Sequence, residues 1–236
     1  MQPYTFEEIA TLKEGEVEAT LHLATLIRVR HPVTRDHLKV CLVNTQTAQL
    51  EKNMSHVESL DKILTRVNKD IDAHIIVAPE YSYYPDSRPL TEQEKDYFLH
   101  KQKDNTKGKL VIPGTFVWQK EGCMYNEAYF ISNGDIIGQY LKCKDGGEWI
   151  AATKFQLKYI QGKEPGIFEW NKLKLGIEIC IDMGTIAAKG IGDRDLLFAI
   201  SCGRQDIDTR CLRNGGYGFV NDGYQEFVFI AYKQLL

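Results

Sequence analysis

The sequence predicts an α/β fold in which helices and strands are mixed and packed as a sandwich. Short apolar runs of strand length alternate with longer amphipathic runs of helix length, and Asn133-Gly134-Asp135 gives a hairpin signal near the middle of the chain. Elements of this kind pack helices onto the faces of sheets. The 236 residues are most simply one large domain, and a hydrophobic content of 43% can supply its core.

The first part of the chain is expected to alternate between helix and strand. Residues 5–35 carry apolar side chains at helical spacing, so residues 1–35 are predicted to be an N-terminal helical appendage to a domain of residues 36–236. Leu38–Val43 has the composition of a buried strand. The apolar spacing over Thr47–Lys69 predicts an amphipathic helix of about six turns.

The same alternation is expected to continue to the end of the chain. A capping box, Thr91-x-x-Glu94, predicts the start of another helix. The remaining predicted strands are His74–Pro79, Lys109–Ile112, Asn126–Ser132, Ile136–Lys142, Leu173–Ile181, Leu196–Ser201 and Glu226–Tyr232.

The charge pattern argues against a nucleic-acid surface. The formal net charge is −3, and both signs are scattered along the chain. The densest basic cluster, Arg28-Val29-Arg30-His31 with Arg35 nearby, is short and is interpreted as a solvated face. No apolar run reaches the ~18 residues of a membrane span. We therefore expect neither nucleic acid nor a membrane as a partner.

The chain is expected in the cytoplasm. The N-terminal segment, residues 1–8, lacks both the cationic start and the apolar core of a secretory signal. The cysteines form no C-x-x-C pair, and several lie in apolar runs, as reduced core cysteines do. The six are Cys41, Cys123, Cys143, Cys180, Cys202 and Cys211.

Glu80, Lys142 and Cys180 each lie where an apolar, strand-like run ends. In an α/β sheet, sites form outside the carboxyl ends of strands. A carboxylate, an ammonium and a thiol there supply a general base, a charge stabiliser and a nucleophile. Taken singly, each residue also has a structural explanation, as a capping carboxylate, a solvated lysine and a buried thiol.

Three motifs surround these residues in order along the chain. An apolar strand runs into Pro79-Glu80, and a strand ends in Ile179-Cys180-Ile181-Asp182. Between them, three segments form one long motif: Pro113-Gly114-Thr115-Phe116, Tyr125-Asn126-Glu127-Ala128 and Asn133–Lys142, which ends in Gly138-Gln139-Tyr140-Leu141-Lys142. Together they resemble the signatures of the nitrilase superfamily of carbon–nitrogen hydrolases over about residues 38–232.

The resemblance implies a fold and a reaction. The fold would be an αββα sandwich, and the activity would be hydrolysis of an amide, a ureido acid or a nitrile through a thioester or thioimidate. The resemblance makes Glu80 the general base, Lys142 the charge stabiliser and Cys180 the nucleophile, with the Ile181 backbone N–H beside Lys142 as a second stabiliser. A small-molecule substrate and no cofactor or metal are expected.

Two carboxylates are candidates for supporting roles. Glu148 follows the lysine closely, as a second carboxylate does in many members of the family, although a plain loop carboxylate is an equal alternative. Glu178 shares its strand parity with Cys180, so the two are expected on one face; a paired structural carboxylate is the alternative. Lys144 is a rival to Lys142, but the Tyr-x-Lys register favours Lys142.

Two departures from the family pattern prevent a transfer of substrate from any subfamily. Met183–Ala187 replaces an aromatic residue followed by Phe-Pro-Glu, and Cys143–Asp145 replaces a segment that begins His-Leu. A homodimer is expected over a monomer, because the apolar side chains of residues 1–35 need a partner surface and two-fold dimers are the commonest assembly.

Two other classes of function are open to the sequence. A binding or scaffold protein could keep the same fold without catalysis. A Cys–His protease or transferase would need a histidine to pair with the thiol, and a papain-like order is excluded because every histidine precedes Cys180. A histidine-first order is not excluded by position, but no protease signature surrounds Cys180.

Overall fold

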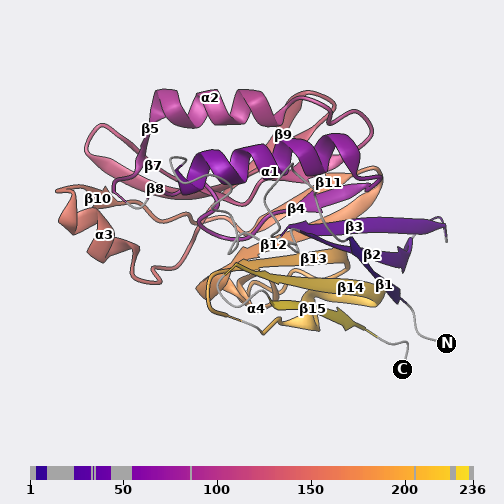
Figure 1. Cartoon of the computed structure of the whole chain (residues 1–236). Helices are drawn as coiled ribbons and strands as arrows, with labels where there is room; N and C mark the ends of the chain where they lie inside the picture. The colour runs from indigo at the N-terminus through magenta and orange to yellow at the C-terminus, as the bar shows by residue number, and fades with distance from the viewer. Residues whose placement is uncertain are drawn as a thin grey trace.

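Two sheets pack face to face, and helices lie on the outer sides (Figure 1). The computed structural model describes residues 4–9, 24–32, 34, 36–43, 55–85, 87–204, 206–223 and 227–233. The first sheet follows the order β1-β2-β3-β4-β6-β8-β7-β5, with β9 and β10 also paired to β8. Its strands are β1 (Tyr4–Ile9), β2 (Ala24–Arg30), β3 (His37–Val43), β4 (Ile75–Val77), β5 (Leu90–Thr91), β6 (Leu110–Ile112), β7 (Thr115–Lys120), β8 (Cys123–Ser132), β9 (Asp135–Leu141) and β10 (Lys158–Tyr159).

The second sheet has the order β11-β12-β13-β14-β15. Its three central strands are parallel, and an antiparallel strand flanks them on each side. The strands are β11 (Gly166–Trp170), β12 (Leu173–Ile179), β13 (Arg194–Ser201), β14 (Leu212–Asp222) and β15 (Phe227–Tyr232). The parallel strands therefore open their carboxyl ends at one edge of the sheet.

Helices α1 (His56–Asp70) and α2 (Glu92–Gln102) cover the outer face of the first sheet (Figure 1). Each begins with a capping box, formed by Ser55 with Glu58 and by Thr91 with Glu94. The second sheet carries the four-residue α4 (Thr185–Ala188) on its outer face, and α3 (Glu148–Lys154) follows β9. The second helical layer is thus much thinner than the first in the described part of the chain.

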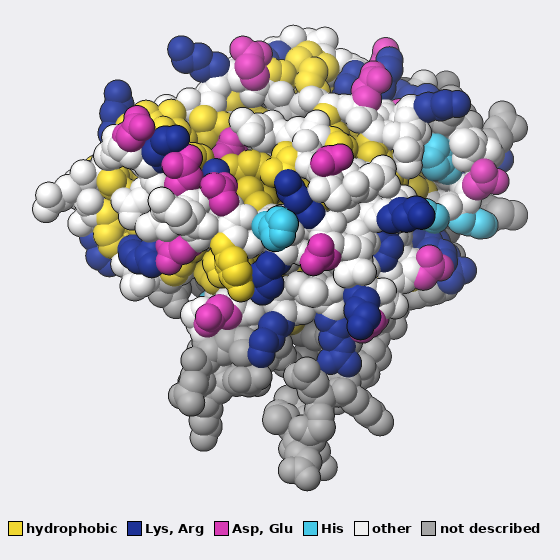
Figure 2. Space-filling view, turned by 90° about the horizontal axis from the view of Figure 1, so that it is seen from above, with side chains coloured by type: hydrophobic (Ala, Val, Ile, Leu, Met, Phe, Trp, Pro, Cys, Tyr) yellow, Lys and Arg dark blue, Asp and Glu magenta, His cyan; other side chains and the backbone are white. Residues whose placement is uncertain are grey.

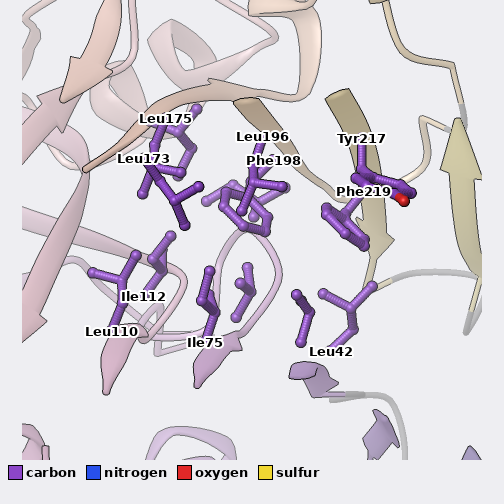
Figure 3. Close-up of a cluster of buried hydrophobic side chains, with 14 of the residues drawn as sticks. Leu42, Ile75, Leu110, Ile112, Leu173, Leu175, Leu196, Phe198, Tyr217 and Phe219 are labelled. Atoms are coloured by element: carbon purple, nitrogen blue, oxygen red, sulfur yellow. The ribbon is translucent and has the colours of Figure 1, made fainter. Parts of the chain in front are cut away.

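The main core lies between the two sheets. On β12, alternate side chains point inward, namely Leu173, Leu175, Ile177 and Ile179. Figure 3 shows side chains of the two sheets facing each other across this core. Ile75 and Ile112 come from the first sheet, and Leu196 and Phe198 come from the second. Because both sheets contribute strand ends beside this core, side chains from different sheets can meet at its edge.

The predicted α/β sandwich is confirmed, and so are most of the predicted strands. The hairpin at Asn133-Gly134 joins β8 to β9, and Asn133 has the positive φ of 52° that such turns need. The predicted helix over Thr47–Lys69 is described from Ser55 onward, and residues 47–54 lie outside the described residues. The strands β7, β11 and β14 and the two-residue strands β5 and β10 were not predicted.

The helical prediction for residues 5–35 is wrong wherever the structure describes them. Tyr4–Ile9 and Ala24–Arg30 are antiparallel strands, and the second pairs with β3. Ile27 and Val29 are fully buried in the core between the sheets. The buried side chains of β2 lie on both faces of the strand, so their spacing was misread as helical. Residues 10–23 lie outside the described residues. A division of the chain after residue 35 stays a prediction.

Charges of both signs are interspersed over the face seen from the α2 side (Figure 2). Within the described residues, no helix combines the length and the apolar character needed to cross a membrane.

Candidate active site

Glu80 lies in a turn that the neighbouring segment holds tightly. The Tyr81 backbone N–H donates to Thr115 Oγ1 at 2.8 Å, and Ser82 Oγ donates to the Pro79 carbonyl oxygen at 2.7 Å. Gly114 has a φ of +84°, and a Cβ there would collide with the Pro79 carbonyl oxygen. Only glycine fits this close approach, so the Pro113-Gly114 motif fixes where Glu80 points.

Lys142 is fully buried and connects two carboxylates. Its backbone N–H continues the pairing with β8 by donating to the Asn126 carbonyl oxygen at 3.0 Å. Its Nζ lies 2.7 Å from Glu80 Oε1 and also forms an ion pair with Glu148 Oε1. A buried ammonium is stable only when such partners offset the loss of water. The Tyr-x-Lys register is therefore the one that enters the site, and the Lys144 side chain is exposed.

Glu148 belongs to this cluster and is not a plain loop carboxylate. It is the first residue of α3, and its Oε2 accepts a hydrogen bond from the Gly146 backbone N–H at 2.7 Å. Gly146 leaves room for the ammonium, since a Cβ there would lie 3.2 Å from Lys142 Nζ. The second carboxylate beside the lysine is thus held by the turn that precedes it.

Two residues that complete the cluster, Asn126 and Tyr81, were not predicted from the sequence. Asn126 Nδ2 donates to Glu80 Oε1 and to Glu148 Oε1, in each case at 3.1 Å. The Tyr81 hydroxyl donates to Glu148 Oε1 at 2.8 Å. Asn126 stands in the Tyr-Asn-x-Ala motif, so its position in the motif was the available signal.

Cys180 lies just after β12, at the start of a 3₁₀ turn, Cys180–Asp182. Its φ is +47°, which is uncommon for a residue with a Cβ and stores strain. Because of this turn the half-buried Cys180 packs against the core between the sheets. Glu80 and Lys142 follow strands of the first sheet and Cys180 follows a strand of the second, so the cluster lies between the sheets.

The expectation that Glu178 and Cys180 share a face is wrong. Strand parity holds as far as Ile179, and the left-handed turn at Cys180 then breaks it. Glu178 points to the outer side, where its carboxylate accepts hydrogen bonds from the Gly184 and Ile186 backbone N–H groups at 2.8 Å each. Glu178 therefore bonds the backbone that leads into α4. This agrees with the alternative prediction, a paired structural carboxylate.

The pKa values of the cluster have clear physical causes. Burial raises the pKa of the Glu80 carboxyl to about 7, against the opposing charge of Lys142. Burial alone would lower the pKa of Lys142, but Glu80 and Glu148 outweigh it and raise that pKa. Burial also works against ionisation of Glu148, yet Lys142 lowers the pKa of that carboxyl. At neutral pH, Lys142 and Glu148 are charged and Glu80 is near its midpoint.

The thiol responds to the charges of the same cluster. Burial and then the charge of Glu80 raise the pKa of Cys180, whereas the charge of Lys142 lowers it. The bonds from Lys142 and Asn126 both end on Oε1 of Glu80, which leaves Oε2 for another donor. The cluster thus brings a thiol, an ammonium and a carboxylate with one oxygen not used by Lys142 or Asn126 into electrostatic contact. Among the described residues, no three His, Cys, Asp or Glu side chains group as a metal site requires.

Solved structures of similar fold agree with this architecture. The nitrilase-superfamily amidase of Nesterenkonia sp. AN1 superimposes with a TM-score of 0.57 at 15% identity, covering 78% of this chain and 76% of the amidase. A CN-hydrolase superfamily protein of Xanthomonas campestris gives 0.54 at 12% identity, covering 73% of this chain and 83% of that one. The chain has the nitrilase-superfamily fold. The αββα sandwich of that superfamily, predicted from three motifs, is confirmed.

Part of a larger protein also resembles this chain in structure. The glutamine-dependent NAD+ synthetase of Acinetobacter baumannii matches with a TM-score of 0.52 at 22% identity over 64% of this chain. This chain spans 30% of the synthetase chain. No protein-family model and no curated protein matches the sequence.

Proposed function

We propose that the protein is a hydrolase that cleaves a non-peptide carbon–nitrogen bond in an amide, a ureido acid or a nitrile. The observation that carries this proposal is the buried contact of 2.7 Å between Lys142 Nζ and Glu80 Oε1, beside the Cys180 thiol. A buried lysine between two carboxylates stabilises a fold little compared with well-packed apolar side chains of similar volume. Next to a thiol, it supplies positive charge where a tetrahedral intermediate would develop negative charge.

The first half of the reaction forms a bond to sulfur. Glu80 Oε2 accepts the thiol proton while Cys180 Sγ attacks the carbonyl carbon of an amide. The electron pair of the carbonyl goes to oxygen, where Lys142 and the Ile181 backbone N–H stabilise it. When the intermediate collapses, the carbon–nitrogen bond breaks, Glu80 returns the proton to nitrogen, and ammonia or an amine leaves. A thioester on Cys180 remains.

The second half releases the acid. Glu80 Oε2 accepts a proton from water as the water oxygen attacks the thioester carbon. The carbon–sulfur bond then breaks, the proton moves to sulfur, and the carboxylic acid leaves. Lys142 does not compete as nucleophile, because its raised pKa keeps it protonated. The sequence of steps needs no cofactor or metal.

An amide is the first substrate class to test. The structural neighbour from Nesterenkonia sp. is an amidase. Ureido acids and nitriles come next, because each offers a carbon that a thiolate can attack in a similar way. The segments that replace the family pattern, Met183–Ala187 and Cys143–Asp145, lie beside Cys180 and Lys142 in sequence. They give the chain its own selectivity, so the panel must be broad.

The test is a screen for ammonia release from small amides, ureido acids and nitriles. We expect turnover of at least one class by the wild-type protein and none by Cys180→Ala. Cys123→Ala is the matched control, because Cys123 is also a half-buried free thiol, and its strand partners are Lys120 and Lys158, which are not members of the cluster. No release from any class would contradict the proposal and favour a silent binding protein on the same fold.

A further inference from the structure

Asp182 is a buried carboxylate that the proposed reaction does not use. It ends the turn that begins at Cys180, and it is fully buried. Its Oδ2 accepts hydrogen bonds from the Tyr140 hydroxyl at 2.7 Å and from the Cys143 backbone N–H at 2.8 Å. Its Oδ1 accepts from the Lys144 backbone N–H at 2.6 Å. Every oxygen of this carboxylate is thus occupied by one short segment.

That segment is the one that carries Lys142. Tyr140 precedes the lysine by two residues on β9, and the two backbone donors follow it directly. The segment continues β9 of the first sheet, whereas Cys180 and Asp182 follow β12 of the second sheet. The carboxylate therefore joins the two sheets where the ammonium and the thiol must meet, with bonds on both sides of Lys142.

We infer that Asp182 is a positioning residue that fixes Lys142 relative to the Cys180 sulfur. The expected effect on turnover rests on the proposed function. The position of Lys142 can also be tested without a substrate, through the pH at which the Cys180 thiol ionises. The charge of Lys142 favours the Cys180 thiolate. If the segment moves away, the thiol loses that charge and ionises at higher pH.

Asp182→Asn is the decisive variant. The two oxygens accept from different backbone N–H groups, so an asparagine must point its NH₂ at either Cys143 or Lys144. One donor then faces another donor, and the segment must shift. Tyr140→Phe is the milder variant, because it removes one hydroxyl and leaves both backbone bonds in place. It keeps the inference testable if Asp182→Asn does not fold.

Asp195→Asn is the matched control. Asp195 is also a buried carboxylate of the second sheet, and it accepts a hydrogen bond from the Lys174 backbone N–H at 2.7 Å. It also forms an ion pair with Arg213 at 2.6 Å. It lies near the start of β13, about 20 Å from the carboxyl end of that strand at 3.3 Å per residue. It can therefore lower stability without reaching the site.

The measurement is alkylation of Cys180 by iodoacetamide as a function of pH, followed by peptide mass spectrometry, with thermal unfolding alongside. We expect Asp182→Asn to move the alkylation midpoint to higher pH, Tyr140→Phe to move it less, and Asp195→Asn to leave it unchanged. On a substrate found by the screen, kcat should fall about 100-fold in Asp182→Asn, as expected for a misplaced group, with a smaller change in KM.

The outcomes separate the inference from the proposed function. An alkylation midpoint at higher pH in Asp182→Asn supports the positioning role even if the wild-type protein hydrolyses nothing in the screen. A wild-type alkylation curve in folded Asp182→Asn overturns the inference even if the protein is an active hydrolase. If Asp182→Asn is unfolded, an unshifted curve in Tyr140→Phe overturns it and a shifted one supports it.

Discussion

Asn221 on β14 donates a hydrogen bond from Nδ2 to the Val77 carbonyl oxygen at the end of β4, at 3.0 Å. The same Nδ2 donates to the Val43 carbonyl oxygen at 3.1 Å. One buried amide of the second sheet thus holds the ends of two strands of the first. The chain runs from Val77 directly into Pro79-Glu80, so this contact sets the position of the candidate base.

Asn221→Ala should lower the free energy of unfolding by about 1–3 kcal/mol, because two buried carbonyl groups lose their donor. Urea denaturation measures this difference. Asn214→Ala is the control, since Asn214 lies on the same strand with an exposed side chain. If the two variants had the same free energy of unfolding, the hydrogen bonds from Asn221 would contribute nothing to stability.

Lys142→Ala should lower turnover by about 100-fold or more, because the developing charge loses its stabiliser. It should also destabilise the fold by about 3–5 kcal/mol, because two buried carboxylates are left without their partner. The assay of ammonia release and thermal unfolding measure the two effects. Lys144→Ala should change neither, as its side chain is exposed and only its backbone bonds Asp182. The reverse pattern would mean that Lys144 is the functional lysine.

Turnover should rise with pH through about 7. Only ionised Glu80 can accept the thiol proton, and burial raises the pKa of that carboxyl to about 7. A profile of kcat/KM from about pH 5 to about pH 9 measures the acid limb. An acid limb with its midpoint near pH 4.5, the ordinary pKa of a glutamate, would contradict the buried environment described for Glu80.

Stability should change in the opposite direction with pH. A carboxyl whose pKa is raised on folding binds its proton more tightly in the folded state. The stability that the raised pKa of Glu80 contributes is fully present below about pH 4.5 and is lost as the pH rises through about 7. Glu80→Gln keeps the shape of the neutral form, so it should lose less stability than the wild-type protein between about pH 5 and about pH 8 in urea denaturation. Equal losses would contradict this prediction.

Much of the architecture followed from local patterns. The capping box at Thr91, the hairpin at Asn133-Gly134 and the apolar runs of β3, β6 and β13 are signals that neighbouring residues create on their own. β2 was misread because Leu26, Ile27 and Val29 are buried on both faces, so the period of two is hidden. β14 was missed because two adjacent glycines within it, Gly215 and Gly216, resemble a turn.

The candidate site was predicted less completely than the fold. Motif order brought together Glu80 and Lys142, and the structure adds Glu148 as a member of the same cluster. The contacts of Asn126 and Tyr81 with Glu148 depend on distances between segments that are far apart in sequence. The parity argument for Glu178 failed because the backbone at Cys180 turns left-handed, which no neighbouring residue type announces.

The central claim is that Cys180 carries the acyl group during hydrolysis. The most direct measurement is rapid acid quenching of the protein during turnover of an active amide, followed by peptide mass spectrometry. We predict the mass of the acyl group on the peptide that contains Cys180 in the wild-type protein and on no peptide of Cys180→Ala, which should also release no ammonia. An acyl group on another residue, or ammonia release by Cys180→Ala at the wild-type rate, would contradict the account.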